Sequence, residues 1–444
     1  MPSTPLAYRA AARLASALAP AFSPLSAKLA AGHRGRRGAG RRLAAWGRES
    51  RDRSRPLVWF HASSVGEGLQ AESVLLELRR MYPEGQYVYT HFSPSAEALA
   101  RRLPVDAADY LPYDLPAAAD QLLEALAPTL IVFSKLDLWP ELATRAAARG
   151  VAVAIVAATV SPGSGRLRWP ARVLLRNGYR AVGLAAAVSG EDAARLALLG
   201  VGSARIRVLG DPRFDSVLRQ LEAVTGDDPL LRFGRGAPTM VAGSTWPADE
   251  AVLLEAFARL RTHRPDSRLI VVPHEPSAAH LRRAEDAARE AGLPGPVRLS
   301  AATGSAPTPL LLVDRVGVLA TLYGAGTMAY VGGGFGSAGL HSVLEPAAWG
   351  VPVTFGPRWN QSRDAALLLE AGGAEALTGR GTAAAEALHR VWRSWIEDEG
   401  RRADQGERAR TVVESGRGAS RRSAEMLADA ISSRPLRTSP IAGR

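Results

Sequence analysis

The sequence contains no cysteine among its 444 residues. Disulfide bonds and metal sites built from thiolates are therefore excluded. Its eight histidines include no HExxH spacing, so we expect no protein-bound metal and no cofactor. No uncharged apolar run reaches the roughly 20 residues that a membrane-spanning helix needs.

Lysine is almost absent as well. Lys28 and Lys135 are the only lysines among 55 basic residues, and arginine occupies nearly every other basic position. An ammonium and a guanidinium differ in shape, hydration and hydrogen bonding, so a lysine kept inside the chain requires an explanation. Lys135 directly follows a predicted strand, which makes it a candidate site residue.

Positive charge is concentrated at the two ends of the chain. Residues 1–55 hold twelve Lys or Arg against two acidic residues, and residues 401–444 hold ten Arg against five. The rest of the chain has a net charge of −3 out of the total of +12. This distribution favours attachment of the ends to an anionic surface, and we expect no nucleic-acid partner.

The N-terminal segment, residues 1–55, is apolar and alanine-rich up to residue 31 and strongly basic afterwards. Its longest uncharged piece, residues 14–27, is too short to cross a bilayer and contains two prolines. Three interpretations stay open at this point: a monotopic membrane anchor, a surface helix with a solvated linker, and a cleaved signal peptide.

Buried-strand patterns alternate with helical patterns through most of the chain, which predicts two α/β domains. We place the first at residues 56–218, with strands expected at 57–60, 87–90, 110–112, 130–133 and 151–157. Residues 219–237 are polar and turn-rich and are interpreted as a connection. The second domain, residues 238–400, has strands expected at 239–242, 268–272, 310–313, 328–331 and 351–355. Residues 401–444 are interpreted as a basic C-terminal helix and tail.

The most informative stretch follows the predicted strand 328–331. It begins with three glycines, Gly332, Gly333 and Gly334, and continues into a helix predicted at 342–349. Glycines let the backbone approach a ligand, and the amide groups at a helix start suit a phosphate. Ser342 with Glu345 can form a capping box, or Glu345 can accept hydrogen bonds from ribose hydroxyls. His341 lies beside the same helix start.

Several further candidates follow predicted strands, where open α/β sheets bind ligands. In the first domain, Ser64 and Gly66 lead into a helix whose first turn carries Glu67. Glu67 is either a carboxylate favoured by the helix dipole or a general base. Lys135 and Asp137 form a charged pair after another strand, read either as a solvated loop or as part of the site. In the second domain the candidates are Ser244, Thr245 and His274.

Seven motifs in order resemble the 3-deoxy-D-manno-octulosonic acid (Kdo) transferase family. They are HASSVGE (61–67), YLPYDLP (110–116), DLWPEL (137–142), VLGDPRFD (208–215), GSTWPADE (243–250), VPHEP (272–276) and GGGFGSAGLHSVLEP (332–346). The resemblance implies the GT-B arrangement, in which two Rossmann-like domains face a central cleft. It also implies an inverting, metal-independent transfer of Kdo from CMP-Kdo, the donor substrate, to a lipid A precursor at the cytoplasmic face of the inner membrane.

The resemblance assigns roles by position. Glu67 matches the catalytic base of the family, and Lys135 and Asp137 fall on its acceptor-side motif. Ser244, His274, the three glycines, His341 and Glu345 fall on its CMP-Kdo side. Many members have Glu-Thr-Glu where this chain has Lys135-Leu136-Asp137, so the departure from the family pattern falls on the acceptor side. A nucleotide-sugar epimerase, or a binding relative with the same two-domain plan, is the alternative.

Overall fold

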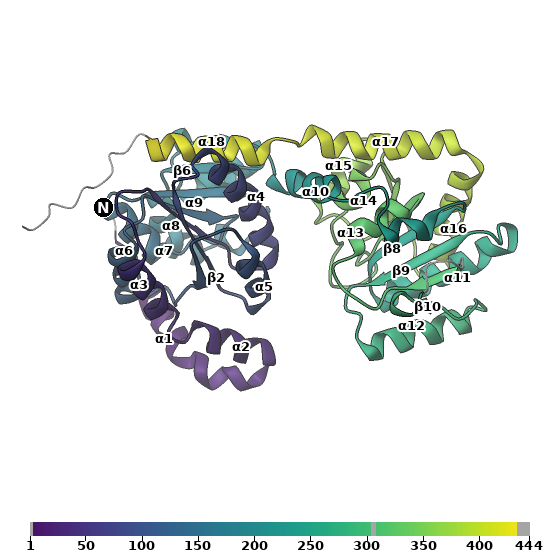
Figure 1. Cartoon of the computed structure of the whole chain (residues 1–444), viewed down its shortest axis with the longest axis horizontal. Helices are drawn as coiled ribbons and strands as arrows, with labels where there is room; N and C mark the ends of the chain where they lie inside the picture. Colours follow the sequence, from purple (N-terminus) through teal and green to yellow (C-terminus); the bar gives the residue numbers. More distant parts are fainter. Residues whose placement is uncertain (1–2, 303–307, 433–444) are drawn as a thin grey trace, which may run out of the picture. The chain divides into compact units, whose positions relative to one another are not determined.

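The computed structural model describes residues 3–302 and 308–432 (Figure 1). The chain folds as two compact units. Unit 1 comprises Met1–Ser216 and Arg417–Arg444, and unit 2 comprises Val217–Gly416. Each unit contains a seven-stranded parallel sheet, so the predicted α/β class with two Rossmann-like domains is confirmed. The cleft between the domains stays a prediction.

The sheet of unit 1 has the strand order β3-β2-β1-β4-β5-β6-β7. Its strands are β1 (Leu57–His61), β2 (Gln86–His91), β3 (Ala107–Tyr110), β4 (Leu130–Ser134), β5 (Ala152–Ala158), β6 (Leu184–Ala187) and β7 (Ile206–Val208). The helices after the first strand are α4 (Val65–Met81), α5 (Glu97–Arg102), α6 (Pro116–Leu126), α7 (Pro140–Ala148), α8 (Ala171–Ala181), α9 (Gly190–Leu199) and α10 (Pro212–Glu222).

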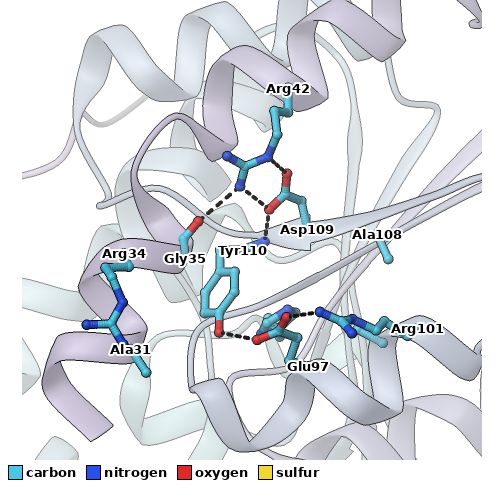
Figure 2. Close-up of a pocket in the computed structure, with 11 residues that line it drawn as sticks. Ala31, Arg34, Gly35, Arg42, Glu97, Arg101, Ala108, Asp109 and Tyr110 are labelled. Carbon is cyan, nitrogen blue, oxygen red and sulfur yellow. Dashed lines mark hydrogen bonds and ion pairs between the residues drawn. The ribbon is translucent and has the colours of Figure 1, made fainter. Parts of the chain in front are cut away.

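The N-terminal segment forms three helices that belong to unit 1: α1 (Leu6–Phe22), α2 (Ala27–Arg36) and α3 (Ala39–Glu49). The helix α3 packs on α6 and β3. Arg42 donates two hydrogen bonds of 2.7 Å to Asp109 in β3 (Figure 2). The guanidinium of Arg36 lies 3.9 Å from the ring centre of Phe92 and donates to its carbonyl. Part of the basic run therefore holds the segment to the domain.

A buried cluster of polar groups attaches the start of α1 to unit 1. The Tyr8 hydroxyl donates to Asp114 Oδ2 at 2.8 Å, and Arg9 Nε donates to Glu141 Oε2 at 2.8 Å. Asp114 also accepts from the amides of Glu141 and Leu142, the first turn of α7, at 2.8 and 2.9 Å. Burial raises the pKa of Asp114 to about 6 against these hydrogen bonds.

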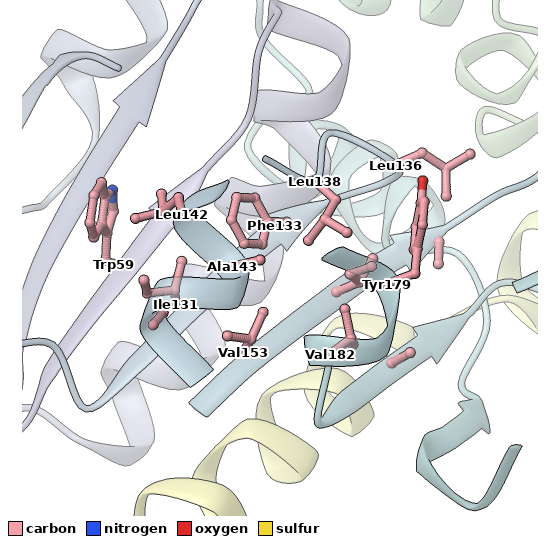
Figure 3. Packing of buried hydrophobic residues seen from close by; sticks show 14 of the residues in the cluster. Trp59, Ile131, Phe133, Leu136, Leu138, Leu142, Ala143, Val153, Tyr179 and Val182 are labelled. Atoms are coloured by element: carbon pink, nitrogen blue, oxygen red, sulfur yellow. The ribbon is translucent and has the colours of Figure 1, made fainter. Parts of the chain in front are cut away.

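The core of unit 1 lies on both faces of the sheet because successive strand residues point to opposite sides. In β5, Val153 and Ile155 pack on one face with Trp59, Phe133 and helices α6 to α8 (Figure 3). The alternate residues, including Ala154, pack on the other face with α4 and α5. Helix α18 (Ala419–Ser432), from the far end of the sequence, completes this second face through Met426 and Leu427.

The start of α18 is fixed by Asp215, whose carboxylate accepts from the amides of Gly418 and Ser420 at 2.6 Å each. The preceding helix α17 (Glu399–Ser415) packs instead on α14, α15 and α16 of unit 2. The two halves of the predicted C-terminal segment thus belong to different units. Helix α10 also runs across the boundary between the units and into the predicted connection.

The sheet of unit 2 has the order β10-β11-β9-β8-β12-β13-β14. Its strands are β8 (Thr239–Thr245), β9 (Arg268–Pro273), β10 (Val297–Arg298), β11 (Leu310–Leu312), β12 (Met328–Val331), β13 (Val353–Phe355) and β14 (Ala374–Ala376). Its other helices are α11 (Pro247–His263), α12 (Ala278–Glu290), α13 (Leu319–Leu322), α14 (Leu344–Ala348), α15 (Arg363–Glu370) and α16 (Thr382–Glu397). Trp392 and Trp395 of α16 are fully buried in its core.

Most predicted strands lie within one to three residues of the observed ones. The third strand was misplaced: residues 110–112 were expected, but β3 ends at Tyr110. The chain then turns through Pro112, which lacks the amide that a ladder hydrogen bond needs. The helix predicted at 342–349 is also shorter, because α14 begins at Leu344 and ends at Ala348.

Asp114→Asn should lower the free energy of unfolding by about 1–3 kcal/mol, because an amide nitrogen would face a backbone N–H donor. Urea unfolding measures this loss. Asp120→Asn is the matched control: Asp120 pairs with Arg145 and Arg149 near the surface, where an ion pair contributes under about 1 kcal/mol.

The same pair of proteins tests the ionisation of Asp114. Burial raises the pKa of Asp114 from 3.8 to about 6. Between these two pH values the native protein keeps a proton on Asp114 that the unfolded protein has released. The contribution of this group to stability is therefore lost as the pH rises through that window. The advantage of wild type over Asp114→Asn should shrink as the pH rises from 3.8 to about 6 and stay level above that window, and an advantage that grows with pH would contradict the assignment.

Candidate functional site

Both sheets have a topological switch point, where the chain returns to the centre and continues in the opposite direction. In unit 1 it lies between β1 and β4, and in unit 2 between β8 and β12. Open parallel sheets bind ligands beyond the carboxyl ends of such strands. The predicted site residues fall largely on the loops that follow these four strands, which gives each unit its own candidate half-site.

In unit 1 the structure brings Glu67 and Lys135 together. Glu67 lies in the first turn of α4, after β1, and Lys135 directly follows β4. Lys135 Nζ is 3.5 Å from Glu67 Oε1. The Ser134 hydroxyl donates to the Glu67 carbonyl at 2.8 Å, which fixes the start of α4 against β4. Both side chains are partly exposed, by 45% for Lys135 and 18% for Glu67, so both can reach a substrate.

The backbone of Lys135 is strained. Its φ is +58°, in the left-handed region that non-glycine residues seldom occupy. The Lys135 amide donates to the Val156 carbonyl of β5 at 2.8 Å, which holds this conformation. Strain of this kind costs of order 1–3 kcal/mol and tends to occur at functional sites.

Asp137 completes the carboxylate pair at this edge. Its Oδ2 accepts a 3.1 Å hydrogen bond from the Ser63 amide in the loop after β1. Burial raises the pKa of Asp137, repulsion from Glu67 adds to the rise, and the hydrogen bonds from Ser63 oppose it. Two carboxylates and an ammonium therefore share one electrostatic environment at the switch point.

Ser64 and Gly66 occupy the turn between β1 and α4. Ser64 is the N-cap residue, but its side chain makes no capping hydrogen bond. A Cβ atom at Gly66 would meet nothing within 4 Å, so packing does not require glycine there. Neither residue is needed to hold the turn in its observed form, which leaves both open to a role with substrate.

In unit 2 a buried aspartate joins the two loops of the switch point. Asp249, with no exposed surface, lies in the first turn of α11. It accepts from the amides of Trp246 and Gly333, at 3.0 Å each, and from the Tyr330 hydroxyl at 2.7 Å. Burial raises the pKa of Asp249, and these hydrogen bonds act in the opposite direction.

The three glycines pack tightly against neighbouring backbone. A Cβ atom at Gly332 would lie 2.3 Å from the carbonyl oxygen of Ser244. Gly333 has a φ of +95°, and a Cβ atom there would lie 2.0 Å from the carbonyl oxygen of Gly339. A Cβ atom at Gly334 would lie 2.7 Å from the Cα and amide nitrogen of Gly356. The loop thus requires glycine for its own folding, and approach to a ligand stays a prediction.

Trp246, His274 and His341 form a stack of rings beside this loop. The His274 and His341 ring centres are 4.3 Å apart, and those of Trp246 and His274 are 5.0 Å apart. Trp246 Nε1 donates to His341 Nε2 at 3.0 Å. An indole N–H can only donate, so neutral His341 must carry its proton on Nδ1. Burial and repulsion from His274 lower the pKa of His341 to about 4.

Thr245 and Ser244, at the end of β8, differ in accessibility. Thr245 is buried, and its hydroxyl donates to Glu250 at 2.8 Å. His280 of α12 binds the same Glu250 oxygen at 2.9 Å and the carbonyl of Glu275 at 3.1 Å, which ties the loop carrying His274 to α11. Ser244 is half-buried and has a φ of +53°. Ser244 is therefore better placed than Thr245 to contact a ligand.

The capping-box interpretation of Ser342 and Glu345 is wrong. Val343 is the N-cap residue of α14, and no side chain caps this helix. Ser342 Oγ accepts from the Leu344 amide at 3.4 Å within the preceding turn. Glu345 is half-buried in the first turn of α14 and contributes to raising the pKa of the buried Tyr323.

A cavity of about 470 Å³ lies elsewhere in unit 1, between α2, α3, α5 and the end of β3 (Figure 2). Its carboxylates are already paired, Asp109 with Arg42 and Glu97 with Arg101 and Tyr110. It contains none of the predicted site residues. Among the described residues, no group of three or more His, Asp or Glu side chains is placed to hold a metal ion.

Sequence reasoning missed Trp246, Asp249 and Tyr330. The first two stand in the GSTWPADE motif, and an aspartate three residues into a helix start was the available signal for Asp249. Its bonds to Tyr330 and Gly333 join positions more than 80 residues apart and could not be inferred from spacing.

The family model and the relatives that match this sequence carry the same description. The family model described as 3-Deoxy-D-manno-octulosonic-acid transferase (kdotransferase) matches residues 37–216. A 3-deoxy-D-manno-octulosonic acid transferase from Bordetella pertussis is 31% identical, over 84% of this chain and 87% of the relative. The corresponding protein from Haemophilus influenzae is 25% identical, over 83% and 86%.

The similar solved structures include UDP-GlcNAc 2-epimerases. The enzyme from Neisseria meningitidis, bound to UDP-GlcNAc, has a TM-score of 0.61 at 14% identity, covering 84% of this chain and all of that one. That from Methanocaldococcus jannaschii has a TM-score of 0.54 at 14% identity, with 81% and 100% covered. This likeness shows the two-domain fold. The sequence relatives, matched over most of both chains, show that the chain belongs to the 3-deoxy-D-manno-octulosonic acid transferase family of glycosyltransferases.

Proposed function

We propose that the protein transfers Kdo from CMP-Kdo to a lipid A precursor in lipopolysaccharide biosynthesis, with inversion at the anomeric carbon and without a bound metal. Membership of the Kdo transferase family supports Kdo as the sugar that is transferred. The observation that carries the mechanism is the Glu67 carboxylate, 3.5 Å from the Lys135 ammonium at the switch point of unit 1. A carboxylate at this place matches the family base.

In this proposal Glu67 acts on the acceptor. A sugar hydroxyl is a very weak acid, so a positioned base must take its proton as the new bond forms. The acceptor oxygen attacks the anomeric carbon of Kdo, and the bond from that carbon to the CMP phosphate oxygen breaks with its electron pair. CMP leaves as the free nucleotide. Lys135 offsets the repulsion between Glu67 and Asp137 and orients an anionic group of the substrate.

Unit 2 would hold the donor. The neutral His341 presents an Nδ1–H donor, and the loops after β8 and β12 carry Ser244 and the glycine amides. Glu345 is proposed to accept hydrogen bonds from the ribose hydroxyls, which are worth roughly 1.5–3 kcal/mol when one partner is charged. The epimerase alternative is not retained, because the likeness to epimerases extends to the fold alone.

The N-terminal segment is proposed to hold the enzyme at the cytoplasmic face of the inner membrane. No helix in the described part of the chain is long and apolar enough to cross a bilayer. Helix α1 nevertheless exposes large apolar side chains, with Leu14 60% and Phe22 52% accessible, and Lys28 follows in α2. Apolar side chains with basic neighbours suit adsorption to an anionic lipid surface.

Glu67→Gln should reduce transfer by about 10²- to 10⁴-fold while CMP binding and folding persist, because general-base catalysis contributes about that factor. The measurement is mass spectrometry of the products from CMP-Kdo and a lipid A precursor. Glu77→Gln, half-buried on the same helix and paired with Arg80, should leave the rate unchanged. Wild-type turnover by Glu67→Gln would remove this residue from the mechanism, and no Kdo product from wild type would refute the function.

Lys135→Arg should lower turnover at least roughly tenfold, about 1.4 kcal/mol in the barrier. A larger guanidinium must fit at a strained backbone position beside Glu67, where a compact ammonium now lies. Lys28→Arg makes the same substitution at the other lysine of the chain, which is exposed in α2, and should have no effect on kcat. Equal turnover by both variants over a range of acceptor concentrations would show that Lys135 is incidental.

Trp246→Phe should raise the pKa of His341, because a protonated Nε2 would no longer face the indole N–H, while burial and repulsion from His274 still lower it. NMR titration of the His341 ring checks this shift. Loss of the fixed tautomer should weaken CMP binding by roughly two- to tenfold, as expected for one hydrogen bond. Trp359→Phe, outside the stack, is the control. An unchanged titration would contradict the assigned tautomer.

A further inference from the structure

One face of α8 carries an exposed apolar stripe that the proposed reaction does not use. Trp169, just before the helix, is 83% exposed, and Val173 is 55% exposed. Val173 and Asn177 are spaced by four and therefore lie on the same side of α8, and Trp169 lies just before the N-cap residue Pro170. Asn177 Nδ2 donates to the carbonyl of Ser3, directly before α1, at 2.8 Å. The stripe therefore extends from the attachment of α1 along α8.

A second stripe of the same helix is entirely basic. Arg172, Arg176 and Arg180 follow at the same spacing of four, Arg168 precedes the helix, and all four are exposed. Like charges at this spacing destabilise a helix by about 0.2–0.5 kcal/mol per pair. Within residues 3–302 and 308–432, no carboxylate pairs with any of the four. The repulsion between these arginines is therefore not offset by a carboxylate of the described residues, which indicates an external anionic partner.

We propose that this face of α8 is a second membrane-contact element, which binds the surface of an anionic bilayer beside α1. Tryptophan prefers the interface between water and lipid, and each arginine near an anionic surface is attracted to it. Helix α8 contacts α1, which also exposes large apolar side chains. The inference rests on the proposed membrane association, and it adds a contact about 150 residues away along the sequence.

The absence of cysteine makes a direct test possible in the full-length protein. Single variants Trp169→Cys, Phe22→Cys and Val316→Cys are labelled with an environment-sensitive fluorophore and mixed with vesicles. Val316, in unit 2, is 77% exposed and serves as the control. With phosphatidylglycerol vesicles, the emission should shift to the blue at positions 169 and 22 but not at 316. Phosphatidylcholine vesicles should give little shift at any position.

The outcomes separate the inference from the proposed function. A shift at position 22 without one at 169 overturns the inference and leaves membrane association standing. No shift at either position refutes both. Equal shifts at all three positions indicate non-specific adsorption and also contradict the inference. A shift at 169 alone supports it and removes α1 as the anchor.

A charge test needs no label. Replacing Arg172 and Arg176 with Gln together should weaken binding to phosphatidylglycerol vesicles at low salt by roughly tenfold or more, because each basic residue contributes to the attraction. Arg282→Gln with Arg283→Gln, exposed on α12 of unit 2, removes the same charge and should have a smaller effect. Equal losses for both double variants would mean that only net charge matters, which would overturn the specific role of α8.

Discussion

The Asp249 carboxylate is the contact on which the candidate donor half-site depends. It is fully buried, and burying an ionised carboxylate is unfavourable unless hydrogen bonds compensate. The amides of Trp246 and Gly333 and the hydroxyl of Tyr330 provide that compensation. Because the three donors come from α11, the glycine loop and β12, one side chain sets their relative positions. The ring stack is held in place by the same carboxylate, because the amide of Trp246 is one of its three donors.

Unit 1 uses buried or half-buried aspartates in the same way. Asp114 binds the first turn of α7 together with Tyr8 of α1, and Asp215 binds the first turn of α18. All three aspartates lie in motifs through which the chain resembles its family. Those motifs therefore contain two kinds of residue. Some, such as Glu67 and Lys135, are accessible to substrate, whereas the aspartates position the elements that carry them.

The sequence predicted the fold class because strand and glycine-loop signals are local. The strand expected at 328–331 is β12, with the same bounds. Glu67 and Lys135 were separate candidates in the sequence, and their contact follows from the pairing of β1 with β4, the strands that precede them. The contacts of Asp249, the attachment of α1 and the short α14 could not be predicted, because each depends on residues distant in sequence.

The position of α18 has a consequence for how the chain can fold during synthesis. Residues 419–432 cover an apolar face of unit 1 that is formed by α4 and the even-numbered residues of β5. Helix α18 can cover this face only after the whole of unit 2 has left the ribosome. Domains usually fold in the order in which they are made, and exposed apolar surface favours aggregation. In this chain the first unit to be made is the last to be completed, so truncated or stalled chains leave an apolar face without its cover.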